Sequence, residues 1–105
     1  MKKKIRIDFG HVDLDKLNAD ADFDSAAERI LPKALVQMGE ALAEEGWIEL
    51  QKTMKKSGLK PNKSSGDKRK FVRDGGQNYK RSASAKDKRE LKATIVTQLR
   101  EQKAS

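Results

Sequence analysis

The chain has 105 residues and a net charge of +8, with 38% charged and 35% hydrophobic residues. It contains no cysteine, which excludes disulfide bonds, thiolate zinc sites and cysteine nucleophiles. No stretch approaches the roughly 20 apolar residues that cross a bilayer, and no apolar run follows the basic N-terminus as in a signal peptide. We therefore expect a soluble protein with one small domain over residues 1–105 and no membrane partner.

The charge is sorted along the chain. Residues 8–50 carry eleven acids and three bases, whereas residues 51–105 carry seventeen bases and five acids. Segments of opposite sign attract each other, either within one copy or head to tail between copies, and the excess base favours an acidic partner. The low apolar content predicts that part of the chain is disordered in isolation or is covered by a partner. These features indicate a charged binding or assembly protein.

The N-terminal region predicts a short strand and one helical turn. Ile5, Ile7 and Phe9 alternate with charged residues, and this period of two is typical of a half-buried strand. The next segment, residues 13–17, fits one helical turn with Asp13 as its N-cap. Residues 18–24 are acidic and weakly patterned, so we expect a loop there.

A long amphipathic helix is predicted next. Residues 25–28 fit a capping box, and Pro32 is expected to kink the helix or to begin a second one. Apolar and small residues then recur every three or four positions until the stop signal at Ser57 and Gly58. We expect this stripe to form core or to pack against a second subunit, which predicts a homo-oligomer. The predicted subunit-packing residues are Leu35, Met38, Gly39, Leu42, Gly46, Trp47, Leu50 and Met54.

Residues 59–84 form a basic segment that we expect to be mobile within the domain. Gly75 and Gly76 lie between two short β-compatible runs, which predicts a β-hairpin. Phe71 and Tyr79 are interleaved with the cations, as suits phosphate neutralisation with occasional base stacking. The alternative is a solvated segment that contacts an acidic protein. The predicted contact residues are Lys60, Lys63, Lys68, Arg69, Lys70, Arg73, Lys80 and Arg81.

The C-terminal region predicts a helix over about residues 85–102. Residues 84–87 match a second capping box, and Leu91, Ile95 and Leu99 recur every fourth position. The β-branched run at 94–97 leaves a strand as a competitor. Together the elements predict an α+β fold that is mostly helical, with an N-terminal strand, a long kinked central helix, a basic loop with a hairpin and a C-terminal helix.

The sequence offers no set of residues for catalysis or metal binding. His11 is the only histidine, and nothing near it completes a dyad or triad. Asp20, Asp22 and Asp24 alternate as in a calcium loop, but the glycine and glutamate that an EF-hand needs fall on Ser25 and Leu31. We therefore expect a protein that is not an enzyme, with no cofactor, no metal and no small-molecule substrate.

One arrangement resembles a known family. The strand at 4–9, the Leu-Asp-Lys-Leu turn at 14–17, the helical stretch 39–45 and the basic loop after it resemble the tail-completion and head–tail connector proteins of tailed bacteriophages. The resemblance covers residues 3–58.

The resemblance implies a non-enzymatic α+β subunit that forms rings between portal and tail tube. Such a protein would be found in the virion, and in the host cytoplasm during assembly. Its partners would be other copies of itself and other virion proteins, and its basic loop would contact DNA. The alternative is a small basic nucleic-acid-binding protein, such as a phage-encoded regulator.

Overall fold

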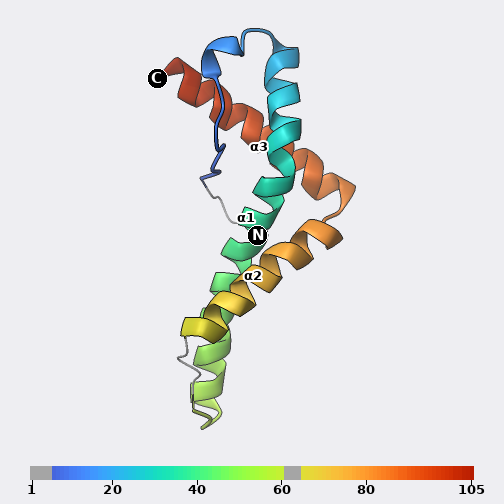
Figure 1. The fold of residues 1–105 in the computed structure, drawn as a ribbon. Coiled ribbons are helices and arrows are strands. Elements are labelled where there is room, and N and C mark those ends of the chain that lie inside the picture. The colour runs from blue at the N-terminus through green and yellow to red at the C-terminus, as the bar shows by residue number, and fades with distance from the viewer. Residues whose placement is uncertain (1–5, 61–64) are drawn as a thin grey trace. The chain divides into compact units, whose positions relative to one another are not determined.

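The computed structural model describes residues 6–60 and 65–105 (Figure 1). It contains a short 3-10 helix, η1 (Leu14–Lys16), and three α-helices: α1 (Asp20–Lys56), α2 (Ser65–Ser82) and α3 (Ala85–Ala104). The chain divides into two compact units. The terminal unit comprises residues 6–35 and 83–105, and the helix-pair unit comprises residues 36–82. Helix α1 contributes its first part to the terminal unit and its second part to the helix-pair unit.

The predicted α+β class is wrong, because the described residues form helices and irregular segments without a strand. The predicted N-terminal strand is irregular over residues 6–10, and Ile5 lies outside the described part of the chain. The alternation reflects one-sided burial: Ile7 is buried and Phe9 half-buried, whereas Arg6 and Asp8 are exposed. The Ile7 amide donates to Gln98 Oε1 on α3 at 3.1 Å, so a helix side chain bonds the backbone where a strand was expected.

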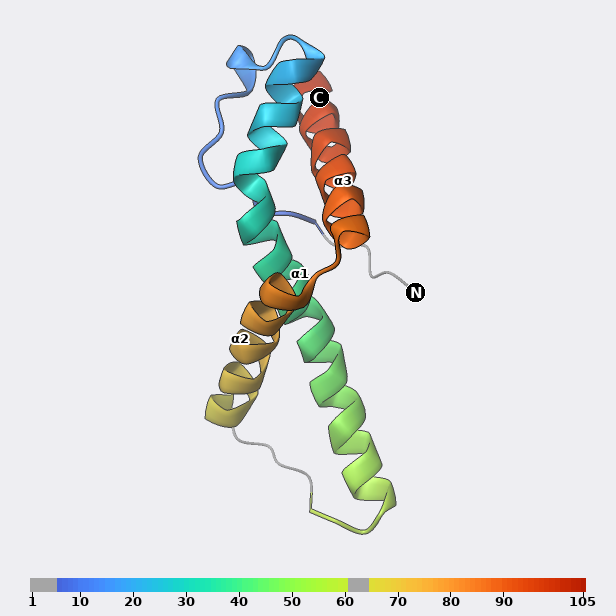
Figure 2. The ribbon, with the colours of Figure 1, turned by 90° about the vertical axis from the view of Figure 1, so that its right-hand side faces the viewer.

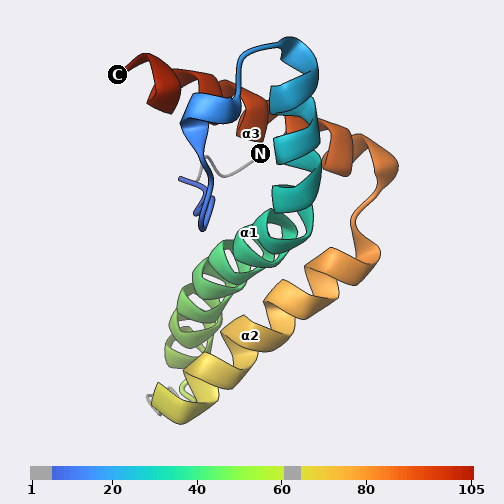
Figure 3. The same cartoon turned by 45° about the horizontal axis from the view of Figure 1, so that its top comes forward.

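The terminal unit has an apolar core between α3 and the first part of α1, with η1 beside α3 (Figure 3). The predicted C-terminal helix is confirmed, since Ser84 Oγ accepts from the Asp87 amide at 3.1 Å. The four-residue spacing of Leu91, Ile95 and Leu99 places all three on one buried face, which outweighs the β propensity of residues 94–97. The buried apolar residues of this unit are Ile7, Leu17, Phe23, Ala26, Ala27, Ile30, Ala34, Leu35, Leu91, Ile95 and Leu99.

The long helix begins earlier than predicted. Residues 20–24 form the first turn of α1 and not a loop, because Asp22 caps it. The Asp22 carboxylate accepts from the Ala19 amide at 2.9 Å and the Asn18 amide at 3.1 Å, and these bonds hold the pKa of Asp22 below its ordinary value. Pro32 lies inside α1, which is helical on both sides of it. A single helix therefore occupies both the predicted loop and the predicted helix.

The predicted end of this helix is confirmed. After Lys56, the Gly58 amide donates to the Lys55 carbonyl at 3.2 Å and the Leu59 amide to the Met54 carbonyl at 2.8 Å. Gly58 has φ of +80°, a left-handed conformation that costs glycine little. This pair of bonds is the Schellman motif, and it satisfies carbonyls that would otherwise lack a partner.

In the helix-pair unit, α2 runs antiparallel to the second part of α1 (Figure 2). Three glycines bring the two backbones together. A Cβ on Gly39 would lie 2.7 Å from the Gly75 carbonyl oxygen, and a Cβ on Gly76 would lie 2.9 Å from the Val36 carbonyl oxygen. A Cβ on Gly75 would lie 2.4 Å from the Ala43 Cβ. Only residues without a side chain allow this approach.

The predicted β-hairpin at Gly75–Gly76 is therefore wrong. Both glycines lie inside α2 and neither has positive φ, so they serve helix contact and not a turn. Beyond the glycines, the rings of Trp47 on α1 and Phe71 on α2 lie 5.5 Å apart. Lys68 Nζ lies 3.6 Å from Glu44 Oε1 across the same pair of helices.

We expect Gly39→Ala to destabilise the helix pair by about 1–3 kcal/mol, because the new methyl group meets backbone atoms that cannot turn aside. Gly46→Ala is the matched control. Its Cβ would meet only the Phe71 ring edge, at 3.9 Å, so the change should raise helix stability by up to about 1 kcal/mol. Thermal unfolding by circular dichroism in dilute solution measures both variants. Equal melting temperatures for the two variants would contradict the glycine contact.

Charged pairs also hold α3 to the first part of α1. Lys92 Nζ lies 3.1 Å from Asp24 Oδ1 and 3.3 Å from Glu28 Oε2. The bonds to Asp24 and then to Glu28 raise the pKa of Lys92 above its ordinary value. Arg100 pairs with Asp20, and its guanidinium lies 4.5 Å from the centre of the buried Phe23 ring. Three of the acids that precede Pro32, namely Asp20, Asp24 and Glu28, thus have bases of α3 as partners.

The Lys92 contacts give stability a dependence on alkaline pH. A raised pKa means that their contribution is complete below the unfolded lysine pKa of about 10.4 and is lost as pH rises through the higher folded value. Lys92→Met should therefore lower the melting temperature at pH 7, and its deficit relative to wild type should shrink above about pH 10.4. Lys88→Met, which changes an exposed lysine of the same helix, should leave the curve unchanged. A deficit that is constant with pH would exclude this linkage.

Candidate functional site

Helix α2 is rich in basic residues. Six bases and two acids lie within its eighteen residues. Arg69–Lys70 and Lys80–Arg81 are eleven residues apart, which is three helical turns, so both pairs share one face, with Arg73 between them. All five side chains are exposed. We call this surface the basic face; it consists of Arg69, Lys70, Arg73, Lys80 and Arg81.

The basic face is short of carboxylate partners. Among the described residues, Arg69, Lys70, Arg73 and Lys80 form no ion pair, and Arg81 Nη2 donates to Asn78 Oδ1 at 2.7 Å. Lys68 differs, because it is half-buried and bridges to Glu44. No carboxylate of the described residues neutralises these cations, so the basic face presents positive potential to solvent.

The structure positions the basic face through the packing of α2. Gly75, Gly76 and Tyr79 contact α1, and the five cations of the basic face remain exposed outside this contact. Asp67 in the first turn and Lys80 and Arg81 in the last turn have the signs that the helix dipole favours. Five of the eight predicted contact residues are thus brought together.

The remaining predicted contact residues lie elsewhere. Lys68 belongs to the edge of α2 that meets Glu44, and Lys60 is exposed in the segment after α1. Lys63 lies outside the described residues. The predicted stacking role of the aromatics finds no support, since Phe71 lies against Trp47 and the Tyr79 Cβ lies close to Gly39.

The predicted packing stripe is divided among different surroundings. Leu35 is buried in the core of the terminal unit, Gly39 contacts α2, and Trp47 contacts Phe71. Met38 and Met54 are half-buried. Leu42, Gly46 and Leu50 remain exposed. The stripe therefore supplies core to both units and leaves one row of α1 uncovered.

Residues considered for metal binding or catalysis have structural surroundings. Asp20 pairs with Arg100, Asp22 caps α1 and Asp24 pairs with Lys92, so the three carboxylates do not converge. His11 is exposed. Within residues 6–60 and 65–105, no three His, Cys, Asp or Glu side chains are grouped as metal ligands. Nor does any helix of this described part have the length and apolar character that crossing a membrane requires.

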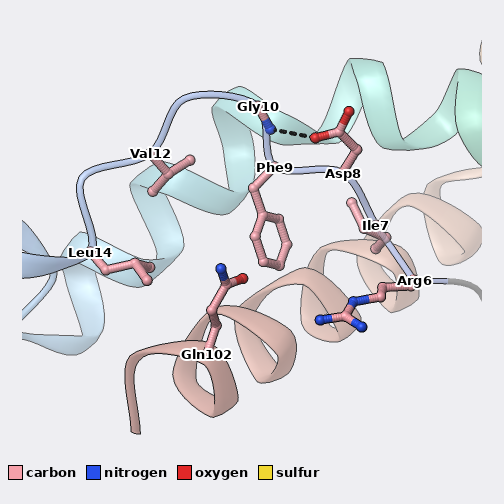
Figure 4. A pocket seen from close by; sticks show the side chains of 8 residues that line it. All are labelled: Arg6, Ile7, Asp8, Phe9, Gly10, Val12, Leu14 and Gln102. Carbon is pink, nitrogen blue, oxygen red and sulfur yellow. Dashed lines mark hydrogen bonds between the residues drawn. The ribbon is translucent and has the colours of Figure 1, made fainter. Parts of the chain in front are cut away.

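A pocket of about 400 Å³ lies in the terminal unit between the N-terminal segment and the end of α3 (Figure 4). The Phe9 ring and the Gln102 side chain point toward it, and the Gly10 amide donates to Asp8 Oδ1 at 2.9 Å beside it. Its lining mixes apolar side chains with one base and one acid, and it includes no nucleophile or histidine. The lining residues are Arg6, Ile7, Asp8, Phe9, Gly10, Val12, Leu14 and Gln102.

Comparison of the chain with protein-family models, with curated protein sequences and with solved structures finds no match.

The shared helix face of the cations was not predicted from the sequence. The signal was present in the eleven-residue spacing of the two basic pairs, but the Gly-Gly dipeptide was interpreted as a turn. Periodicity could have revealed the face, because an interval of eleven matches three helical turns and does not match the period of a strand.

Proposed function

We propose that the protein binds nucleic acid through its basic face, without reading base sequence. The observation that carries the proposal is the alignment of five exposed cations along three turns of α2, none of them with a carboxylate partner among the described residues. Arg69 and Arg73 are four residues apart, a rise of about 6 Å along the helix. Regularly spaced cations of this kind neutralise a phosphate backbone.

The preferred ligand is a duplex. Binding of single strands depends on exposed aromatic rings on which bases stack. The Tyr79 Cβ lies close to Gly39 of α1, and Phe71, although 39% exposed, has its ring against Trp47, so neither ring belongs to the basic face. A duplex carries two strands of phosphate and needs no stacking surface, which is what the basic face can satisfy.

The phosphate contacts predict a steep dependence on salt. Changing Arg69, Arg73 and Lys80 together to Ala should reduce the slope of log K against log salt by about 2.7, since each phosphate contact contributes about 0.9. Changing Lys86, Lys88 and Arg89 on α3 removes the same three charges, also from exposed positions, and should leave the slope nearly unchanged. Fluorescence anisotropy with a labelled duplex at several salt concentrations measures both.

Equal losses in the two triple variants would show that net charge alone drives binding and would remove the basic face from the proposal. Binding of an acidic protein or of polyglutamate with the same affinity and the same sensitivity to the α2 changes would favour the alternative of an acidic protein partner.

The absence of stacking can be tested at Phe71. Phe71→Leu keeps an apolar side chain against Trp47 but removes the ring. We expect its affinity for a single strand and for a duplex of equal length to match wild type, with the duplex bound more tightly by both proteins. A tenfold or greater loss of single-strand affinity would indicate stacking, which is worth about 1–3 kcal/mol per base.

A structural role at the head–tail junction of a phage stays a prediction. The turn at Leu14–Lys16 and the long helix on which the resemblance depended are present, but the described residues contain no strand and the expected basic loop is helical from Ser65 onward. The exposed row of α1 is the observation that favours assembly. A ring-sized particle in native mass spectrometry would support this second function.

A further inference from the structure

The cations of the basic face fall into two groups along α2. The first group is Arg69, Lys70 and Arg73, and the second group is Lys80 and Arg81. Residues 74–79 between them contain no base, and we call them the interval. The inner cations of the two groups, at positions 73 and 80, are about 10.5 Å apart along the helix axis. The outer cations, at positions 69 and 81, are about 18 Å apart.

The side chains that the interval exposes beside the cations are unsuited to phosphate. Gln77 is exposed and lies four residues after Arg73 and four before Arg81, so it stands between the two groups on the same side of α2. Asp74 is exposed and lies beside Lys70, four residues earlier. An amide carries no charge, and a carboxylate repels phosphate. The basic face therefore suits phosphates at its two ends and none at its middle.

This arrangement matches two separate rows of phosphate better than one continuous row. Phosphates of one strand recur about every 3.4 Å along a duplex axis. If α2 lay along one strand, about three of them would stand opposite the interval, without a cation and close to the carboxylate of Asp74. If α2 lies across a groove, one group meets each strand and the interval lies over the groove. The second orientation leaves no phosphate opposite the interval.

We propose that α2 binds across the major groove of a DNA duplex, with the first group on the phosphates of one strand and the second group on those of the other. This inference rests on the proposed binding of a duplex and adds which duplex and which groove. The major groove of B-form DNA is about 12 Å wide and admits an α-helix. That width falls between the separations of the inner and the outer cations. The minor groove is about 6 Å wide, so both of its edges would lie opposite the interval.

Groove depth favours DNA over RNA. The major groove of B-form DNA is about 8.5 Å deep, so the interval can lie between the two strands while both groups contact phosphate. The major groove of an RNA duplex is too narrow for side chains to read, and its minor groove is shallow. The floor of a shallow groove would meet the interval before both groups reached the phosphates. In the DNA complex, Gln77 is the side chain nearest to the base edges.

Disulfide cross-linking to a modified duplex tests the groove, because the chain has no cysteine of its own. Gln77→Cys is mixed with a short DNA duplex that carries a thiol tether either on cytosine N4, in the major groove, or on guanine N2, in the minor groove. We expect cross-linking to the major-groove thiol to be about tenfold faster than to the minor-groove thiol, since only the major groove admits the helix. Equal rates for the two tethers, or a faster reaction in the minor groove, would overturn the proposal.

Ser82→Cys is the matched control for cross-linking. Ser82 is exposed on the same helix but lies five residues after Gln77, about 140° around the helix and outside the basic face. It should react slowly with both tethers. Rates equal to those of Gln77→Cys would show random collision and would contradict the orientation. Circular dichroism of each variant verifies that its helices are intact.

A base added to the interval tests the orientation without a cross-link. In Gln77→Lys the new cation faces the groove and not a phosphate, so the slope of log K against log salt for a DNA duplex should stay nearly unchanged. If α2 instead lies along one strand, the new lysine meets a phosphate and the slope should steepen by about 0.9. Fluorescence anisotropy at several salt concentrations measures this slope, and a steeper slope would refute binding across the groove.

Comparison of DNA and RNA duplexes of the same length and sequence separates this inference from the proposed function. We expect the wild-type protein to bind the DNA duplex about tenfold more tightly at one salt concentration, because the two duplexes differ in groove shape and not in phosphate charge. Equal affinities would refute the groove and leave phosphate binding by the basic face intact. Failure to bind either duplex would refute the proposed function itself.

Discussion

The backbone contact between α1 and α2 at Gly39, Gly75 and Gly76 determines what the helix-pair unit can present. Because no side chain separates the two helices at this point, the inward side of α2 is occupied by backbone and by Tyr79. The five cations of the basic face lie outside this contact, whereas Lys68 at its edge meets Glu44. The Gly75–Gly76 dipeptide, which was predicted to form a hairpin turn, instead lies inside α2. The basic face exists only while α2 is helical and packed against α1. Packing and surface charge are therefore two consequences of one steric constraint.

The two units differ in how their charged side chains are paired. In the terminal unit, Asp20, Asp24 and Glu28 have Arg100 and Lys92 as partners, so α3 neutralises part of the acidic excess of the N-terminal half. In the helix-pair unit, an ion pair between α1 and α2 joins Lys68 and Glu44, whereas the basic face has no carboxylate partner among the described residues. Acids and bases from distant parts of the sequence thus pair within the terminal unit, whereas the basic face of the helix-pair unit is left without carboxylate partners among the described residues. Exposed ion pairs contribute little individually, so this distribution matters more for binding than for stability.

The sequence predicted elements whose signal is local and repeated. Leu91, Ile95 and Leu99 repeat every fourth residue with a serine cap before them, and the glycine stop at Gly58 uses chemistry confined to a few residues. Prediction from the sequence failed where one pattern of residues is compatible with two structures. Alternation at Ile7 and Phe9 accompanies burial against a helix as well as against a sheet, and Gly75–Gly76 suits a helix crossing as well as a turn. The cap by Asp22 was missed because its carboxylate reaches back to Ala19 and Asn18, whereas the expected cap was Ser25.

The sequence does not show why a glycine is required at a position, but the atoms that a Cβ would meet there do. At Gly39 the space is filled by the same chain, whereas at Gly46 it is bordered by one ring edge and solvent. Both glycines fall on one stripe of α1, so the spacing of residues in the sequence could not distinguish the close backbone contact at Gly39 from the more open site at Gly46.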